Sequence, residues 1–224
     1  MLIERLVAQY FGTNCWILAP KQSSECIVVD PGIAVPDFVP QILAATSRLN
    51  LKPVAVLITH GHVDHTYSLF PLSQQGGVST CYIHSDDRAL LANPEKGLGP
   101  QGLALMKELA PEKKWYEPDR VIELHDGTSF EVAGLSIESL HAPGHTAGST
   151  MFKIDSQYLL SGDVLFKGAI GRTDLPTSDP AKMNQSLKRK VLTLSDEIKV
   201  LPGHGDVTTI GEERANNPFL IAVN

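Results

Sequence analysis

The order of apolar and polar positions predicts several strands in the first part of the chain. Alternating positions predict strands over 2–9 and 15–18, and the run CIVVD predicts a strand over 26–30. The following DPG ends this strand, because proline and glycine do not continue strand pairing easily. Apolar residues at helical spacing predict a helix over 37–49, and the unbroken apolar run over 54–59 predicts a strand buried on both faces.

The second part of the chain alternates between strand-like and helix-like segments. Residues 121–140 predict an antiparallel meander, with turns at the pairs Asp126-Gly127 and Ala133-Gly134. Further strands are predicted over 149–154 and 158–166, a helix over 179–194, and a last short strand and loop over 199–205. Because strands and helices mix without a repeat or a linker, the pattern predicts one α/β domain over residues 1–224, with two layers of sheet covered by helices.

Residues 93–119 interrupt this pattern and hold four of the fifteen prolines together with several glycines. This composition predicts either a helical excursion or a mobile flap. A flap would cover a site, whereas a plain surface insertion would have no such role, and the sequence leaves both open.

Composition and charge narrow the classes of partner. A net charge of −6 without a basic cluster is unsuited to binding a nucleic-acid backbone. No apolar run approaches the roughly 18 residues of a membrane span, and Glu4 and Arg5 interrupt the N-terminal apolar stretch, unlike a signal peptide. The three cysteines, Cys15, Cys26 and Cys81, are scattered, which predicts buried thiols. We therefore expect a cytoplasmic protein with no nucleic-acid or membrane partner.

A cluster of histidines follows the apolar run that ends at residue 59. The stretch THGHVDH holds three of the eight histidines of the chain. Alternate residues of an extended loop point the same way, so His60 and His62 can bind one metal, while Asp64 and His65 can turn to a neighbouring point. Imidazole and carboxylate are ligands for zinc, with iron or manganese as second choices. A hydrophilic loop without a metal is the simpler alternative, but a strand end is where a ligand loop would lie.

Three more candidate ligands stand beside glycines directly after strand-like segments. They are His145 in HAPGHT, Asp163 in LLSGDVLF and His204 in LPGHG, and a neighbouring glycine lets the backbone come close to an ion. Seven candidates exceed what one tetrahedral zinc takes, and they suit two metals ~3.5–4 Å apart with one bridging carboxylate. His84 and His125 are interpreted as structural or exposed, and His141 as buried or supporting the ligands.

With these residues in this order, the sequence resembles the metallo-β-lactamase superfamily, whose HxHxDH motif stands here as HGHVDH. The resemblance implies a four-layered αββα sandwich with two metals at the edge between two mixed sheets. It also implies a division of the ligands: His60, His62 and His145 on the first metal, Asp64, His65 and His204 on the second, and Asp163 bridging both.

The stretches SGDVLFKGAIGRTDLP and ERANNPFL are similar to the short, single-domain glyoxalase II-like hydrolases. The longer glyoxalase II enzymes carry a C-terminal helical domain that helps to hold glutathione. Twenty residues follow His204, so we do not expect that domain here. The lysine and tyrosine that follow the bridging aspartate in the longer enzymes are replaced by GRTD, which contains Arg172.

This site predicts hydrolysis of a small-molecule thioester such as S-lactoylglutathione. A water between two metals becomes a hydroxide near pH 7, and the metals stabilise the developing oxyanion. Asp64 is the candidate catalytic residue, which would hold the hydroxide or take its proton. A thiolate with a pKa of about 8.5 leaves without a general acid. Lys167 and Arg172 are candidate binders of a substrate carboxylate, and two surface charges are the alternative.

Other activities remain open at this point. The persulfide dioxygenases also resemble the chain, including GRTD, and use one iron on matches of His60, His145 and Asp163. A lactonase or another ester hydrolase of the superfamily is a further alternative. The missing signal segment disfavours a periplasmic β-lactamase, and the acidic charge disfavours a nuclease. A metal-stabilised binding domain would bind metal without turning over any ester or thioester.

Overall fold

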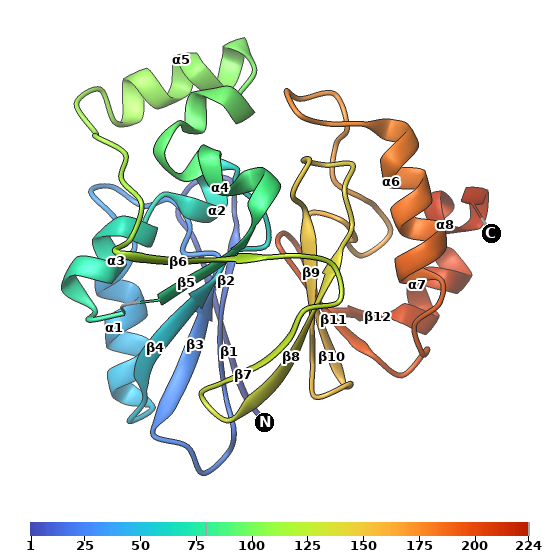
Figure 1. The fold of residues 1–224 in the computed structure, drawn as a ribbon, viewed down its shortest axis with the longest axis horizontal. Coiled ribbons are helices and arrows are strands. Elements are labelled where there is room, and N and C mark those ends of the chain that lie inside the picture. Colours follow the sequence, from blue (N-terminus) through green and yellow to red (C-terminus); the bar gives the residue numbers. More distant parts are fainter. Residues whose placement is uncertain (79, 224) are drawn as a thin grey trace.

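Two six-stranded sheets pack against each other, with helices on both outer faces (Figure 1). The computed structural model describes residues 1–78 and 80–223. The four layers confirm the predicted αββα sandwich. Within the described ranges, no helix is long and apolar enough to cross a membrane.

The first sheet contains β1 to β6 in chain order. Its first three strands are antiparallel, and β3 to β6 run parallel, so the sheet is mixed. The carboxyl ends of these parallel strands lie at one edge, where loops can converge on a site. The strands are β1 (Leu2–Val7), β2 (Asn14–Ala19), β3 (Glu25–Val29), β4 (Lys52–Leu57), β5 (Thr80–His84) and β6 (Arg120–Leu124).

The second sheet has the strand order β12-β11-β10-β9-β8-β7. Only β10 and β11 are parallel, and the other neighbours are antiparallel. The strands are β7 (Ser129–Val132), β8 (Leu135–His141), β9 (Thr150–Ile154), β10 (Tyr158–Gly162), β11 (Lys199–Pro202) and β12 (Thr208–Thr209).

Helices cover the two outer faces and one end of the sandwich. Figure 1 shows α1 and α3 against the first sheet, α6 to α8 against the second, and α2, α4 and α5 toward one end. The helices are α1 (Val39–Arg48), α2 (Val63–Thr66), α3 (Leu69–Gln75), α4 (Ser85–Ala92), η1 (Pro94–Gly97), α5 (Pro100–Leu109), α6 (Pro180–Ser186), η2 (Leu187–Val191), α7 (Ile210–Asn216) and α8 (Pro218–Val223).

Three apolar layers hold the sandwich together. Between the sheets, Leu18 and Leu57 of the first sheet share a buried cluster with Phe152 of the second. Separate clusters lie under α1 and under α6. Each fully buried side chain of this size contributes roughly 1.5–3 kcal/mol. The three cysteines are buried, as predicted.

The predicted elements match the structure with two corrections. The meander over 121–140 is wrong in part: β6 pairs parallel with β5 in the first sheet, and only β7 and β8 form a hairpin in the second. The segment around Asp126-Gly127 therefore crosses between the sheets. Turn residues mark a change of direction, but packing decides which strand becomes the partner. The strand over 158–166 ends at Gly162, whose φ of 49° turns the chain before Asp163.

Residues 93–119 form a helical excursion, which was one of the two predicted alternatives. Its helix α5 is attached through Met106 to a small apolar cluster with Ile33, Val63 and Tyr67. Val63 belongs to the histidine-rich stretch, and Tyr67 follows it. This cluster therefore joins the excursion to the candidate site.

Candidate metal centre

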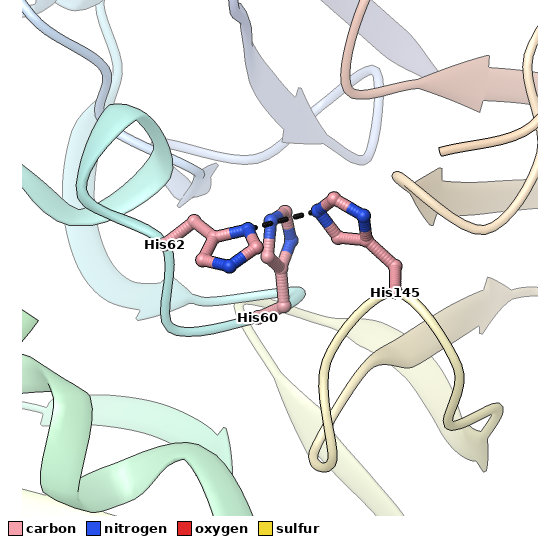
Figure 2. A group of neighbouring side chains, drawn as sticks. All are labelled: His60, His62 and His145. Atoms are coloured by element: carbon pink, nitrogen blue, oxygen red, sulfur yellow. Dashed lines mark hydrogen bonds between the residues drawn. The ribbon is translucent and has the colours of Figure 1, made fainter. Parts of the chain in front are cut away.

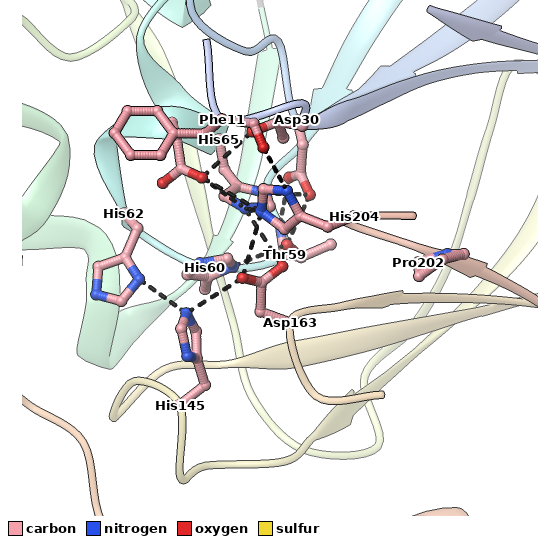
Figure 3. A network of polar contacts seen from close by, with 12 residues as sticks. Phe11, Asp30, Thr59, His60, His62, His65, His145, Asp163, Pro202 and His204 are labelled. Carbon is pink, nitrogen blue, oxygen red and sulfur yellow. Dashed lines mark hydrogen bonds and ion pairs between the residues drawn. The ribbon is translucent and has the colours of Figure 1, made fainter. Parts of the chain in front are cut away.

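The seven predicted ligands meet at one place between the two sheets (Figure 3). They come from four segments that follow β4, β8, β10 and β11, and the first of these segments enters α2. Each of these strands delivers its loop to the same edge of the sandwich. The backbone is extended at His62 and becomes helical from Val63, so Asp64 and His65 are directed away from the point that His60 and His62 share.

His60, His62 and His145 form the first group (Figure 2). One ring nitrogen of each lies within 4.8 Å of the others. Nδ1 of His62 is 2.9 Å from Nε2 of His145, and both side chains are buried. Two imidazole nitrogens at this distance need a proton or a cation between them.

Asp64, His65 and His204 form the second group. Nε2 of His65 lies 3.2 Å from Nε2 of His204, and Oδ2 of Asp64 lies 3.4 and 3.3 Å from these two nitrogens. Neutral imidazole and carboxylate are again a donor set for zinc, iron or manganese.

Asp163 stands between the two groups. Its Oδ2 lies 3.5 Å from Nε2 of both His145 and His204, and its Oδ1 lies 3.4 Å from Nε2 of His65. One carboxylate therefore reaches ring nitrogens of both groups, which is the arrangement that a bridging ligand requires.

The donor atoms fit metal ions by an independent criterion. Nε2 of His60 and Oδ1 of Asp163 are buried and have no hydrogen-bond partner in the described residues. Orphaned buried polar atoms are costly unless an ion or water satisfies them. A Cβ atom on Gly203 would lie 2.4 Å from Oδ1 of Asp163, so glycine is required beside His204, as the sequence predicted.

Protonation differs between the two groups. Burial lowers the pKa of His60, His62 and His145, in the last two to about 4, so these imidazoles are neutral and keep free lone pairs at neutral pH. Burial also acts against charge on His65, but Asp64 and Asp163 outweigh it and raise its pKa to about 10. A proton on His65 thus occupies a place between carboxylates that a divalent cation can take.

Further residues fix which nitrogen of each ring faces the centre. Nδ1 of His145 donates to the carbonyl of Arg172 at 2.8 Å, and Nδ1 of His65 donates to Oδ2 of Asp30 at 2.9 Å. The Thr59 hydroxyl donates to the same Asp30 oxygen at 2.7 Å, so it can accept from Nδ1 of His60 at 3.1 Å. Each Nε2 is then free to bind metal.

Asp30 is a functional residue that the sequence analysis missed. It was interpreted only as the end of a strand, in DPG. The available signal was its position: a carboxylate directly after a buried strand, beside a proline and a glycine, at the same sheet edge as the ligand loops.

A cleft of about 810 Å³ opens onto the metal centre. The candidate ligands His62, Asp64, His145, Asp163 and His204 line it. Its other walls are mainly apolar and come from Phe11, the start of α2, the excursion that carries α5 and the loop after Asp163. The apolar side chains are Phe11, Val63, Leu98, Pro100, Leu105, Phe166 and Leu175.

The two candidate substrate-binding residues lie in different places. Arg172 lines the cleft, and its Nε and Nη2 donate to the Asp174 carboxylate at 2.6 and 2.8 Å. Lys167 is exposed and lies outside the lining of this cleft. Glu213, from the ERANNPFL stretch, accepts a hydrogen bond from the backbone N–H of Gly168 at 2.8 Å. It therefore anchors the loop between Lys167 and Arg172.

The other three histidines gather away from the centre. His84 and His141 stack with ring centroids 3.8 Å apart, and His125 lies beside His84. Nε2 of His141 donates to the carbonyl of Ala147, in the loop that carries His145. His141 therefore supports a ligand loop, which agrees with its interpretation from the sequence.

An αββα sandwich with a histidine-rich centre at the edge between its sheets defines the class of metallo-β-lactamase-fold metallo-hydrolases. The chain belongs to the metallo-β-lactamase superfamily, whose family model matches residues 9–204.

Relatives and solved structures agree with this assignment. An uncharacterised protein of Mycobacterium tuberculosis is 40% identical and is matched over 98% of each chain. The hydroxyacylglutathione hydrolase GloC of Haemophilus influenzae is 34% identical, also over 98% of each chain. A structure of TTHA1623 in a di-iron-bound form is 31% identical, with a TM-score of 0.77 over 97% of this chain and 100% of that one.

Proposed function

We propose that this protein hydrolyses thioesters of the S-lactoylglutathione type with two divalent metals, most suitably zinc. The observation that carries the proposal is the pair of donor groups, joined by Asp163, at the floor of the cleft. The likeness to GloC, which is named a hydroxyacylglutathione hydrolase, supports the choice of substrate.

The residues of the centre have different proposed roles in binding the metals and the water. His60, His62 and His145 would hold one ion, Asp64, His65 and His204 the other, and Asp163 both. When bound, such ions supply a nucleophile from water near neutral pH and polarise the acyl oxygen. Oδ2 of Asp64 accepts a hydrogen bond from the Thr13 hydroxyl and lies near Nε2 of both His65 and His204. This leaves Oδ1 to accept a hydrogen bond from the attacking water and orient it.

The lining of the cleft supports a thioester over an amide. Apart from the ligands, its titratable side chains are Arg172 and Asp174, which are paired with each other. An amide needs a proton donor for its leaving nitrogen, whereas a thiolate with a pKa of about 8.5 leaves without one. The apolar walls can exclude water around the acyl group.

Metal content and activity test the proposal together. Protein reconstituted with zinc, iron or manganese in turn should bind close to two ions per chain by elemental analysis. It should release thiol from S-lactoylglutathione, detected with a chromogenic disulfide. Saturation at one iron, with oxygen consumption on glutathione persulfide and no thioester hydrolysis, would replace the proposal by an oxygenase. Hydrolysis of lactones alone would redirect it to that class of ester.

Arg172→Ala should raise KM for S-lactoylglutathione with little change in kcat. A substrate carboxylate would exchange with Asp174 on the guanidinium, and this contact is equal in the ground and transition states. A charge-assisted hydrogen bond is worth about 1.5–3 kcal/mol. Because the Arg172 side chain is 60% exposed, we expect the low end, about tenfold in kcat/KM.

Lys167→Ala is the matched control, because it removes the same charge from the same loop outside the cleft. It should leave both constants unchanged. A small uncharged thioester should be hydrolysed equally by the wild type and both variants. If Arg172→Ala lost the same factor on the uncharged thioester, the Arg172 side chain would hold in place the loop whose carbonyl contacts His145, and would not bind the substrate tail.

A further inference from the structure

Asp87 lies behind the first ligand group, and in the described part of the chain its side chain makes no hydrogen bond to a proposed ligand. It stands in the first turn of α4, where the helix dipole favours a negative charge, and its side chain is fully buried. A buried carboxylate must be satisfied by hydrogen bonds. The positions of its hydrogen-bond donors show which segments of the chain Asp87 holds in place.

All three side-chain hydrogen bonds of Asp87 go to the two loops that carry the first group. Its Oδ2 accepts from the N–H of Gly61 at 2.8 Å and from the hydroxyl of Thr146 at 2.7 Å. Its Oδ1 accepts from the N–H of Gly148 at 2.7 Å. Gly61 separates His60 from His62, and Thr146 follows His145. One carboxylate thus spans the two loops.

The contact is built for close approach. A Cβ atom on Gly148 would lie 2.7 Å from Cβ of Asp87, so only glycine lets this loop reach the carboxylate. The hydroxyl of Ser149 lies 2.7 Å from that of Thr146, which leaves the Thr146 proton for Asp87. The three donors fix the carboxylate, and the carboxylate fixes the loops.

We infer that Asp87 is a positioning residue that sets the distance between His145 and the pair His60 and His62, and so sets the metal affinity of the first group. The second group depends on other supports, because His65 is held by Asp30 and His204 by the carbonyl of Phe11. The inference rests on the metal centre of the proposed function, but it is independent of the substrate.

Asp87→Asn tests this, because it keeps the shape and sets an N–H₂ group against N–H or O–H donors. Zinc affinity of metal-free protein is measured by chelator competition in two backgrounds. His204→Ala removes a ligand of the second group, and His62→Ala removes one of the first. Asp87→Asn should weaken zinc binding about ten- to hundredfold in the His204→Ala background. In the His62→Ala background the change should stay below about threefold.

Asp86→Asn is the matched control: it removes the neighbouring charge from the same helix turn, but its side chain is exposed. It should leave both affinities unchanged. Equal loss in both backgrounds, or no loss in either, would overturn the inference. If thermal unfolding of the metal-free protein shows that Asp87→Asn does not fold, Thr146→Val takes its place. Losing one hydrogen bond should then cost about three- to tenfold in the His204→Ala background alone, and unchanged affinity would overturn the inference.

Discussion

Asp163→Ala should remove both metals and abolish turnover. Among the residues that the structure describes, Asp163 is the one carboxylate whose oxygens approach ring nitrogens of both groups, at 3.4 to 3.5 Å. Without it, His65 and His204 lose a neighbouring carboxylate and the first group loses its link to the second. Metal polarisation of a substrate is worth several kcal/mol, so we expect kcat to fall at least about a thousandfold.

The measurement is elemental analysis after reconstitution, with kcat on the same sample. Asp174→Ala is the matched control, because it removes a carboxylate that lines the same cleft without approaching the ligand nitrogens. Asp64→Asn should weaken mainly the second metal and lower the rate less. Full metal content and activity in Asp163→Ala would show that Asp163 does not bridge.

The fold was predictable from sequence where a local pattern decides the structure. The buried strand before the histidines, the helix over 37–49 and the turn at Ala133-Gly134 all follow from periodicity and turn chemistry. The placement of β6 was not predictable in this way. Its sequence alternates like a meander strand, but its backbone pairs with β5, and this choice depends on contacts distant in the chain.

The cluster of candidate ligands was predictable because a metal needs particular side chains, and those side chains are uncommon. Histidine beside glycine at a strand end gave His60, His62, His145 and His204 directly. The supporting residues carry no such signal. Asp30 follows a strand at a turn and Asp87 stands beside Asp86 at a helix start, where an aspartate usually needs no further explanation. Only their burial and their hydrogen-bond partners show that they hold the ligand loops.

The substrate residues were the least predictable. Lys167 and Arg172 are both cations shortly after Asp163, and sequence distance does not say which one faces the cleft. The loop turns between them because the N–H of Gly168 is held by Glu213, which comes 45 residues later in the chain. Such a long-range anchor is visible only in three dimensions.

Asp30→Asn should impair both metal groups at once. Asp30 has a φ of 52°, a conformation that asparagine also tolerates, so the variant keeps the backbone. Its two oxygens accept from the N–H and hydroxyl of Thr59 and from Nδ1 of His65. In either orientation, the asparagine amide sets an N–H₂ group against one of these donors. Where the N–H₂ group replaces Oδ2, His65 loses its fixed orientation and His60 loses its own through the Thr59 hydroxyl. Where it replaces Oδ1, the backbone N–H of Thr59 loses its acceptor directly before His60.

Replacing a residue that hydrogen-bonds to a metal ligand typically costs ten- to hundredfold in metal affinity or activity. Because Asp30→Asn affects ligands of both groups, we expect kcat/KM to fall by at least about a hundredfold. The unfolding free energy of the metal-free protein should fall by about 1–3 kcal/mol, because a buried donor loses its acceptor. Chemical denaturation measures the second effect, and steady-state kinetics with chelator competition measures the first.

Thr59→Val separates the two routes from Asp30. It removes the hydroxyl that connects Asp30 to His60 but keeps the backbone N–H of Thr59 and the contact between Asp30 and His65. Zinc binding should therefore weaken about tenfold in the first group, measured in the His204→Ala background, and stay unchanged in the His62→Ala background. Asp30→Asn should weaken binding in both. If the two variants gave the same profile, the orientation of His65 by Asp30 would contribute nothing to metal binding.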